Sequence, residues 1–257
     1  MRGQAAIAVA AAILLTTLIL LVALPKRTLG PEIFIEDDVI EKREIEHMLR
    51  NTIEEAIYAT ALDYDAIKGE DLAKALNKSI ELFFLQKAAE YAMIRGVRCE
   101  ITKTNISSKT SDVIYINETY AEVSCWKGKT RQVAFVHSTA KATVEYKHLG
   151  LFNGIKAKVS LKRGDTPITL INYAAVFQTK ENSATKVYPA LGGLSPRDAI
   201  WYFNITNNHE IKIGVPPELA DNPSCKVIIV ATSVGEGAGT IIVANCKAPI
   251  QPQSGGQ

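Results

Sequence analysis

The sequence predicts an α+β protein in which an N-terminal hydrophobic helix and a helical hairpin precede an antiparallel β-sandwich or partly open barrel. Three observations predict this order. An uncharged apolar run lies near the start of the chain, two amphipathic helical patterns occupy 36–96, and short segments rich in Val, Ile, Thr, Tyr and Phe recur over 97–249. A linker at 28–35 and a flexible tail at 250–257 complete the expected domain plan.

The composition is that of a globular chain, and it excludes several classes of protein. Of 257 residues, 47% are hydrophobic and 22% are charged, which argues against whole-chain disorder and against a collagen-like fibre. The net charge of +2 is too balanced for an electrostatic nucleic-acid binder, so we expect no nucleic-acid partner. Four cysteines and four histidines without clustered ligand spacing predict no metal site, and no motif calls for a cofactor.

Residues 1–27 contain a hydrophobic helix that is long enough to cross a bilayer. The 20 residues from Ala5 to Leu24 carry no charge. At about 1.5 Å per residue they span roughly 30 Å, the thickness of the hydrocarbon core. The run is longer than the apolar region of a cleaved secretory signal, and Leu24-Pro25-Lys26-Arg27 offers no small-x-small cleavage site. The segment therefore predicts a membrane-inserted or filament-core helix.

Two amphipathic helices are expected after the linker. Apolar residues recur at helical spacing from about Val39 to Leu62 and again from about Glu70 to Arg95. Gly96 is placed to end the second helix. Two such helices joined by a short loop form a hairpin whose apolar faces must cover another apolar surface.

The remainder of the chain predicts ten strands that are joined by tight turns. Asn153-Gly154 and Arg163-Gly164-Asp165 are typical of hairpin turns. Many short strands with such turns favour an antiparallel sandwich or barrel. The expected strands lie near 97–105, 112–125, 131–147, 154–161, 167–178, 184–189, 199–206, 210–215, 225–234 and 239–246.

The four cysteines fall as two well-separated pairs at the ends of predicted hairpins. Cys225 and Cys246 flank a hairpin whose midpoint falls at Gly235-Glu236, so equal strand lengths set them face to face. Cys99 and Cys125 flank a second hairpin. We therefore predict two disulfides, each contributing about 3 kcal/mol by restricting the unfolded chain. The alternative is four buried free thiols.

Two other segments superficially resemble ligand-binding motifs. The glycine-rich stretch 233–240 looks like a phosphate loop, but a strand pattern follows it where a helix would be needed, so we interpret it as a hairpin turn. The acidic residues of 63–71 lack the alternating ligand pattern of an EF-hand and predict a helix–helix loop. No Ser or Cys stands in a nucleophile-elbow context, and the histidines lie in separate elements. We expect no catalytic residues and no enzyme activity.

Sequons and paired cysteines favour an extracellular location. Basic residues flank both ends of the apolar run, and the positive-inside rule, which taken alone leans toward a cytoplasmic domain, gives no clean orientation. Asn-x-Ser/Thr sequons exceed the number expected by chance, and an even number of cysteines is typical of oxidised domains. The candidate glycosylation sites are Asn77, Asn105, Asn117 and Asn204.

The opening Arg2-Gly3-Gln4-Ala5-Ala6-Ile7 resembles the class III signal peptides of archaeal type IV pilin-like proteins. Tad-type pilin-like proteins are similar at the same stretch. The resemblance, which covers about the first 25 residues, implies that a prepilin peptidase cuts between Gly3 and Gln4. The apolar helix then packs into a filament core or stays in membrane lipid. Small residues that allow close helix packing are Ala5, Ala8, Ala11 and Ala12.

Together these observations predict a structural protein of the cell membrane and of extracellular surface filaments. The leading hypothesis is a pilin-like subunit of an archaeal type IV filament, which assembles with copies of itself or with related pilin subunits through its N-terminal hydrophobic helix. The alternative is a single-pass membrane-anchored extracellular binding domain that does not polymerise.

Overall fold

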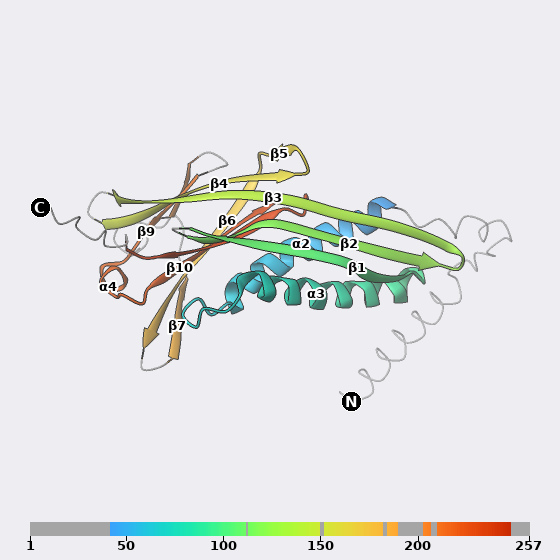
Figure 1. Cartoon of the computed structure of the whole chain (residues 1–257), viewed down its shortest axis with the longest axis horizontal. Coiled ribbons are helices and arrows are strands. Elements are labelled where there is room, and N and C mark those ends of the chain that lie inside the picture. Colours follow the sequence, from blue (N-terminus) through green and yellow to red (C-terminus); the bar gives the residue numbers. More distant parts are fainter. Residues whose placement is uncertain are drawn as a thin grey trace, which may run out of the picture. The chain divides into compact units, whose positions relative to one another are not determined.

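A computed structural model describes residues 42–111, 113–149, 152–181, 184–189, 203–206 and 210–247. The chain divides into two units, Met1–Asp38 and Val39–Gln257, and the described residues all belong to the second unit. They form an α+β domain in which helices come first along the chain and strands follow (Figure 1). The predicted N-terminal hydrophobic helix at 1–27, the linker at 28–35 and the tail at 250–257 lie outside the described residues.

The predicted helical hairpin is present. Helix α2 comprises Lys42–Asp63 and helix α3 comprises Leu72–Arg95. The side chain of Asp71 caps α3, because it accepts hydrogen bonds from the backbone N–H groups that the first turn leaves unpaired. At the other end, Gly96 adopts a left-handed φ of 67°, which permits the helix-terminating bond from its N–H to the Ala92 carbonyl.

The strands are antiparallel and follow the two helices in sequence. A short helix, α4 (Pro217–Ala220), interrupts them. The strands are β1 Arg98–Thr110, β2 Ile114–Lys127, β3 Thr130–Leu149, β4 Phe152–Arg163, β5 Thr166–Ile168, β6 Ile171–Glu181, β7 Ala184–Pro189, β8 Phe203–Thr206, β9 Glu210–Gly214, β10 Lys226–Ser233 and β11 Gly239–Asn245.

All of these strands belong to one continuous open sheet, so the two-sheet sandwich is wrong; the other predicted architecture, a partly open barrel, does allow an open sheet. The order is β7-β6-β10-β11-β2-β3-β4-β9-β8, with β1 paired to β2 and β5 paired to β4. Strand β2 joins the two halves of the sheet, because Ile114 and Tyr115 pair with β11 while Glu118–Lys127 pairs with β3. The pattern of short strands and turns is shared by all these architectures, so it could not separate a divided sheet from a continuous one.

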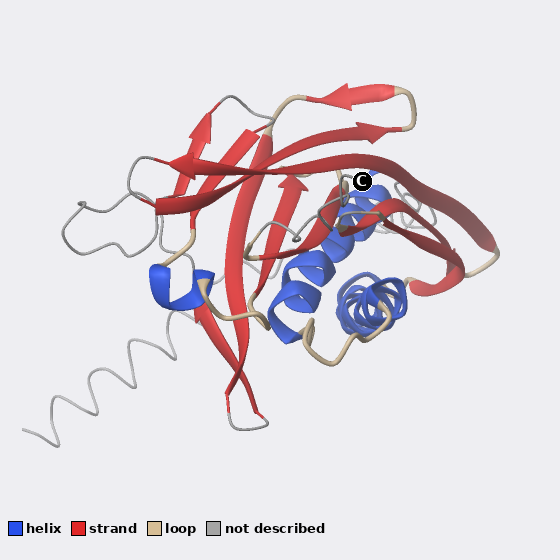
Figure 2. Ribbon diagram, turned by 60° about the vertical axis from the view of Figure 1, so that its left-hand side comes forward, coloured by secondary structure: helices blue, strands red, loops and turns tan. Residues whose placement is uncertain are grey.

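The sheet is strongly curved (Figure 2), and apolar side chains from its two halves meet in one buried cluster, as they would in a sandwich. One cluster of buried residues, the sheet core, unites the inner side chains of β3, β4 and β9 with those of β6, β10 and β11. Examples are Ile155 and Ile211 from the first half, and Phe177 and Val227 from the second half, all of which are fully buried. The sheet therefore packs onto itself across this core.

A second cluster, the helix core, lies between the helical hairpin and the sheet. Ile45, Leu49 and Ile53 of α2 are fully buried in it. Successive residues of β10 alternate between the cores, so that Ile228 contacts the helix core and Ile229 the sheet core. Burying each large aliphatic side chain stabilises the fold by about 1.5–3 kcal/mol. The hairpin is therefore an integral layer of the domain.

Candidate functional site

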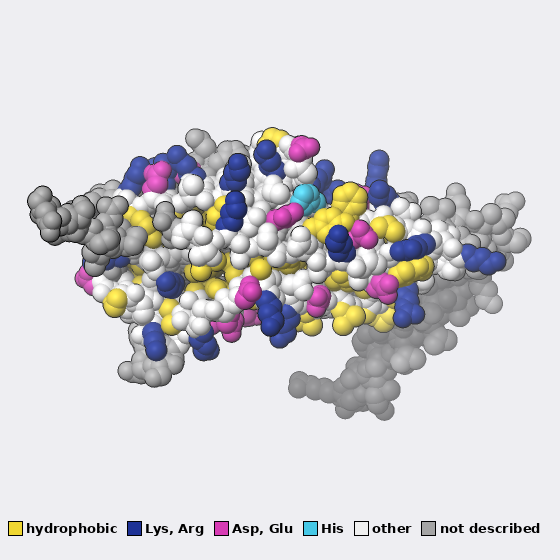
Figure 3. All heavy atoms as spheres, viewed as in Figure 1, with side chains coloured by type: hydrophobic (Ala, Val, Ile, Leu, Met, Phe, Trp, Pro, Cys, Tyr) yellow, Lys and Arg dark blue, Asp and Glu magenta, His cyan; other side chains and the backbone are white. Residues whose placement is uncertain are grey.

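The outer face of β1, β2 and β3 carries hydrophobic and charged side chains, which lie beside a histidine in Figure 3. Directly paired residues of antiparallel strands place their side chains on the same face of a sheet. The register pairs Asn105 with Tyr120 and Tyr120 with His137, so these three residues form one row across the strands. The surface that we call the β1–β3 outer face consists of Lys103, Asn105, Glu118, Tyr120, Glu122, Phe135 and His137.

Alternation along the strands explains why these side chains point away from the core. The residues between them in β2 and β3, including Ala121, Val123 and Ala134, are fully buried in the helix core. Period-two alternation of polar and small apolar residues is typical of a sheet that has one solvated face. Phe135 departs from that pattern, because 57% of this large apolar side chain is exposed. Val133, two residues earlier in β3, is exposed as well, and contiguous exposed apolar side chains often mark a binding surface.

Tyr120 is the centre of the β1–β3 outer face. Its ring centroid lies 6.2 Å from that of Phe135, with an interplanar angle of 22°. The His137 ring lies edge-on at 6.1 Å. The Nζ atom of Lys103 lies 5.4 Å from the Tyr120 centroid, within the range of a cation–π interaction. The aromatic rings are thus held by neighbours on both adjacent strands.

Two carboxylates border the rings. The Tyr120 hydroxyl donates a hydrogen bond of 2.8 Å to Glu122, which lowers the pKa of Glu122 and raises the pKa of Tyr120. Glu118 lies 3.0 Å from Nε2 of His137. The face therefore combines stacking surfaces with hydrogen-bond acceptors and a cation, an arrangement suited to binding a polar molecule that also has an apolar side.

Helix α3 exposes a second apolar surface. Leu82, Leu85, Ala89 and Met93, which we call the α3 stripe, follow one another at spacings of three and four residues and lie on one side of the helix. Leu85 is 69% exposed and Met93 80% exposed. The opposite side of α3, which includes Phe84, is buried in the helix core. Apolar side chains on two opposite sides of a helix are characteristic of a helix that packs against another surface on each side.

The glycine-rich stretch forms the predicted hairpin turn between β10 and β11, and its amides do surround an anion. That anion is the carboxylate of Glu54 in α2, which accepts hydrogen bonds of 3.0–3.1 Å from the backbone N–H groups of Gly235, Glu236 and Gly237. The Ser233 hydroxyl adds a fourth bond of 2.6 Å. Converging amides of this kind form an anion-binding nest. Here the hydrogen bonds of the nest connect α2 to the β10–β11 hairpin.

The predicted acidic helix–helix loop is also a structural connection. Asp65 accepts hydrogen bonds from the backbone N–H groups of Ile67 and Lys68 and from the hydroxyl of Thr185 in β7. The buried Gln178 of β6 accepts from the Ala66 N–H at 2.9 Å and donates to the Tyr64 carbonyl at 2.6 Å. Across the described ranges, no three His, Cys, Asp or Glu side chains are grouped so that they could hold a metal ion.

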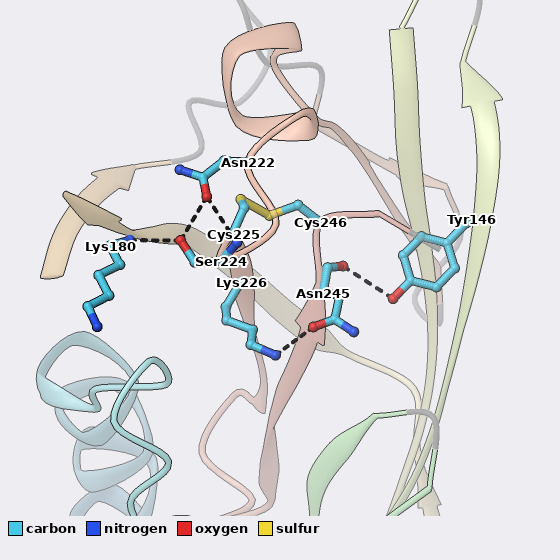
Figure 4. The surroundings of a disulfide bond; sticks show 8 residues. All are labelled: Tyr146, Lys180, Asn222, Ser224, Cys225, Lys226, Asn245 and Cys246. Carbon is cyan, nitrogen blue, oxygen red and sulfur yellow. Dashed lines mark hydrogen bonds between the residues drawn. A yellow bond between two sulfur atoms is a disulfide. The ribbon is translucent and has the colours of Figure 1, made fainter. Parts of the chain in front are cut away.

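Both predicted disulfides are present. Cys99 and Cys125 occupy directly paired positions of β1 and β2. Cys225 and Cys246 lie immediately outside the paired ends of β10 and β11, where the Cys246 N–H donates to the Cys225 carbonyl at 3.0 Å. Figure 4 shows the surroundings of this second bond, including Asn222, whose side chain accepts hydrogen bonds from Ser224. The hairpin geometry inferred from the sequence is thus confirmed at the cysteines.

The sequons differ in their surroundings. Asn105 is exposed on the edge strand β1. Asn77 lies on α3 and donates a hydrogen bond of 2.7 Å to Glu81. Asn117 is half-buried at an irregularity of the β1–β2 register and accepts a hydrogen bond from Ser107. Asn204 lies in β8, outside the residues whose side chains are described.

The predicted processing and helix-packing residues, from Gly3 and Gln4 to Ala12, lie outside the described residues. Within the part of the chain that is described, no helix is sufficiently long and apolar to span a membrane. Clefts on the surface of the described residues include two that border the helical hairpin. One, of about 570 Å³, lies between the start of α2 and the end of α3 and includes His47 and Tyr91. The other, of about 260 Å³, borders the helix–helix loop.

Sequence reasoning missed three features of these surfaces: the Glu54 nest, the aromatic centre of the β1–β3 outer face and the α3 stripe. The stripe had a signal, because Leu82, Leu85, Ala89 and Met93 recur at helical spacing outside the inward set. The nest had none, since its partners are about 180 residues apart along the chain.

Comparison of the chain with known protein families, curated proteins and solved structures finds no match.

Proposed function

We propose that this chain is a structural surface protein, a pilin-like subunit of an archaeal type IV filament. The observation that carries the proposal is the boundary between Gly3 and Gln4, followed directly by the uncharged run Ala5–Leu24. Cleavage at that boundary leaves the apolar run at the mature N-terminus. Burial worth about 25 cal/mol per Å² then holds the run in lipid until helices of other subunits replace the lipid.

Two features of the described domain support this proposal. Paired disulfides persist in extracytoplasmic environments, where no thiol pool reduces them. The α3 stripe gives the domain an apolar surface of the kind that assemblies cover, because contiguous exposed apolar side chains are uncommon on proteins that remain single. A surface subunit with self-association contacts accounts for both features.

The test is to purify surface filaments from the native organism, image them by electron microscopy and identify their subunits by mass spectrometry. We expect this chain among the subunits, with Gln4 as its first residue. A Gly3→Ala variant tests the processing step, because the peptidase of the proposed class recognises the glycine. The variant protein should retain its leader and should be absent from the filaments. Finding Met1 retained in assembled protein would contradict the class III interpretation.

A membrane-anchored extracellular binding domain is the second candidate, and the β1–β3 outer face is the observation that favours it. An exposed Phe135 stacked beside Tyr120 and bordered by carboxylates offers a ligand surface on a domain that never polymerises. The same filament preparation separates the two candidates. An oxidised chain that is present at the cell surface but absent from every filament would replace the pilin-like proposal with this one.

A further inference from the structure

The three sequons whose side chains are described, those of Asn77, Asn105 and Asn117, expose their asparagines to different extents. In α3, the hydroxyl of the Asn77 sequon, Ser79, donates to the Ala75 carbonyl, and the Asn77 amide is held by Glu81. The hydroxyl residue of the Asn117 sequon, Thr119, is 1% exposed. The fold therefore already binds or buries side chains of both the Asn77 and the Asn117 sequon. The hydroxyl of the Asn105 sequon, Ser107, also takes part in a hydrogen bond, which it donates to Asn117. What distinguishes Asn105 is the asparagine itself, which is the exposed one among the three sequons whose side chains are described.

Asn105 also stands at a specific position on the sheet. It pairs directly with Tyr120, and Cβ atoms of such pairs lie about 4.5–5.5 Å apart on one face. Tyr120 in turn stacks with Phe135. Any group attached to Nδ2 of Asn105 therefore begins beside the two aromatic rings.

The chemistry of the β1–β3 outer face matches a carbohydrate. A pyranose ring has one or two faces of C–H groups that pack on aromatic rings, while its hydroxyls extend sideways as hydrogen-bond donors and acceptors. Tyr120 and Phe135 supply the rings, and Glu118 and Glu122 border them with acceptor oxygens. Lys103 supplies a donor on the side of Asn105. An apolar side chain as exposed as Phe135 would be covered by such a partner.

We infer that Asn105 is an N-glycosylated residue and that the first sugars of its glycan pack on Tyr120 and Phe135. The inference rests on the extracellular location in the proposed function, which a filament subunit and a non-polymerising anchor share. In an anchor it assigns the β1–β3 outer face to the chain's own glycan and not to a separate ligand. The glycan covers the apolar part of the β1–β3 outer face in the same molecule, so that face is a platform for the chain's own modification.

The covalent step requires a glycosyltransferase and a sugar donor linked to a lipid phosphate. Nδ2 of Asn105 bonds to the anomeric carbon while the bond from that carbon to the phosphate oxygen breaks. The phosphate leaves with the bonding electron pair, and the amide nitrogen gives up one proton to a base of the transferase. The exposed position of Asn105 on the edge strand β1 leaves it accessible to such an enzyme.

The first measurement is glycopeptide mass spectrometry of native, surface-derived protein. We expect the peptide containing Asn105 to carry a glycan mass that the Asn105→Gln variant loses. An unmodified Asn105 in surface protein whose cysteines are oxidised would overturn the inference and leave the proposed function intact. Four alkylatable thiols in native protein would instead overturn the extracellular location itself, and with it both proposals.

The second measurement tests the packing of the glycan by hydroxyl-radical footprinting of the intact chain. Asn105→Gln should raise the oxidation of Tyr120 and Phe135 several-fold over the glycosylated protein. Met93 on α3, which is 80% exposed and belongs to a different surface, serves as the internal control and should not change. A matched Asn77→Gln variant should leave both aromatics protected. Equal oxidation with and without the Asn105 glycan would show that the sugars do not pack on the face.

Discussion

Glu54 joins the first described helix to the last hairpin through a single carboxylate. In Glu54→Gln, one acceptor oxygen becomes an N–H₂ donor that faces the amides of Gly235 or Gly237. We expect this change to lower the free energy of unfolding by about 2–3 kcal/mol, because charge-assisted bonds are lost and a backbone donor is left unpaired. Chemical denaturation of the full chain in detergent measures the effect.

Glu55→Gln is the matched control, because the neighbouring Glu55 is exposed and forms an ion pair with Lys87 at the surface of the described domain. Its removal should change the free energy of unfolding by less than about 1 kcal/mol. Equal losses in the two variants would show that the nest contributes little beyond an ordinary surface charge.

Asp65 gives the helix–helix loop a dependence on pH. Partial burial acts to raise the pKa of Asp65, but hydrogen bonds from Lys68 and Thr185 outweigh it and lower the pKa in the folded state. A lowered pKa stabilises the fold above the unfolded value of about 3.9, and this stabilisation is lost as the pH falls through the folded value. Asp65→Asn should therefore cost more stability at pH 7 than at pH 3.

Denaturant unfolding of the wild-type and Asp65→Asn chains at both pH values tests this sign. Asp63→Asn provides the control, since Asp63 is exposed at the end of α2. If Asp65→Asn costs as much at pH 3 as at pH 7, the native contacts of Asp65 do not depend on its charge.

At the scale of elements, the disulfides close the two hairpins at their open ends. The Cys225–Cys246 bond closes a loop with a sequence separation of 21. Replacing both cysteines with alanine should lower the free energy of unfolding by about 3 kcal/mol, because the unfolded chain regains loop entropy. Non-reducing peptide mapping of the native protein should recover Cys99–Cys125 and Cys225–Cys246. Crossed pairs would contradict the register of these strands.

Helix α3 offers two adjacent residues with opposite roles. Phe84 is 3% exposed and Leu85 is 69% exposed. Phe84→Ala should lower the free energy of unfolding by about 3–5 kcal/mol, because it leaves a cavity in the helix core. Leu85→Ala should change it by no more than about 0.5 kcal/mol in the isolated chain. Thermal or denaturant unfolding of the two variants side by side measures the difference, and similar losses would mean that α3 is covered on both sides even in the single chain.

The elements themselves were largely predictable, whereas their arrangement was not. Helical periodicity and the glycine after Arg95 located α2 and α3 to within a few residues, since both signals are local. Pairing of β11 with β2 involves only two residue pairs, Ile242 with Tyr115 and Val243 with Ile114, and depends on how both cores fill. Among the site residues, the cysteines were predictable from hairpin symmetry. Glu54 was not, because its exposed-face position in α2 resembles that of any other surface glutamate.

For the whole molecule, assembly is expected to depend on close packing of the alanine-rich N-terminal run. Ala8→Leu and Ala11→Leu add bulk, and overpacking a tight helix contact costs about 1–3 kcal/mol per site. That cost recurs in every subunit of a filament, whereas insertion into lipid tolerates leucine. Filaments should therefore disappear from the cell surface while the amount of membrane-bound chain stays unchanged.

Leu20→Ile is the control for this experiment, because it conserves side-chain volume within the same apolar run. Surface filaments and membrane fractions are quantified together for all three variants. Normal filaments from both Ala8→Leu and Ala11→Leu would show that these alanines do not form close contacts between subunits.

The Glu54 nest has a consequence for the timing of biosynthesis. The carboxylate is made early, and the Ser233 hydroxyl that it binds lies 179 residues later in the chain. At about 5–20 residues per second, a ribosome needs roughly 10–40 s to cover that distance. During this interval β10 and β11 do not yet exist, so the apolar side of α2 has only part of its eventual cover. The domain therefore completes its fold only after nearly all of the chain has emerged from the ribosome.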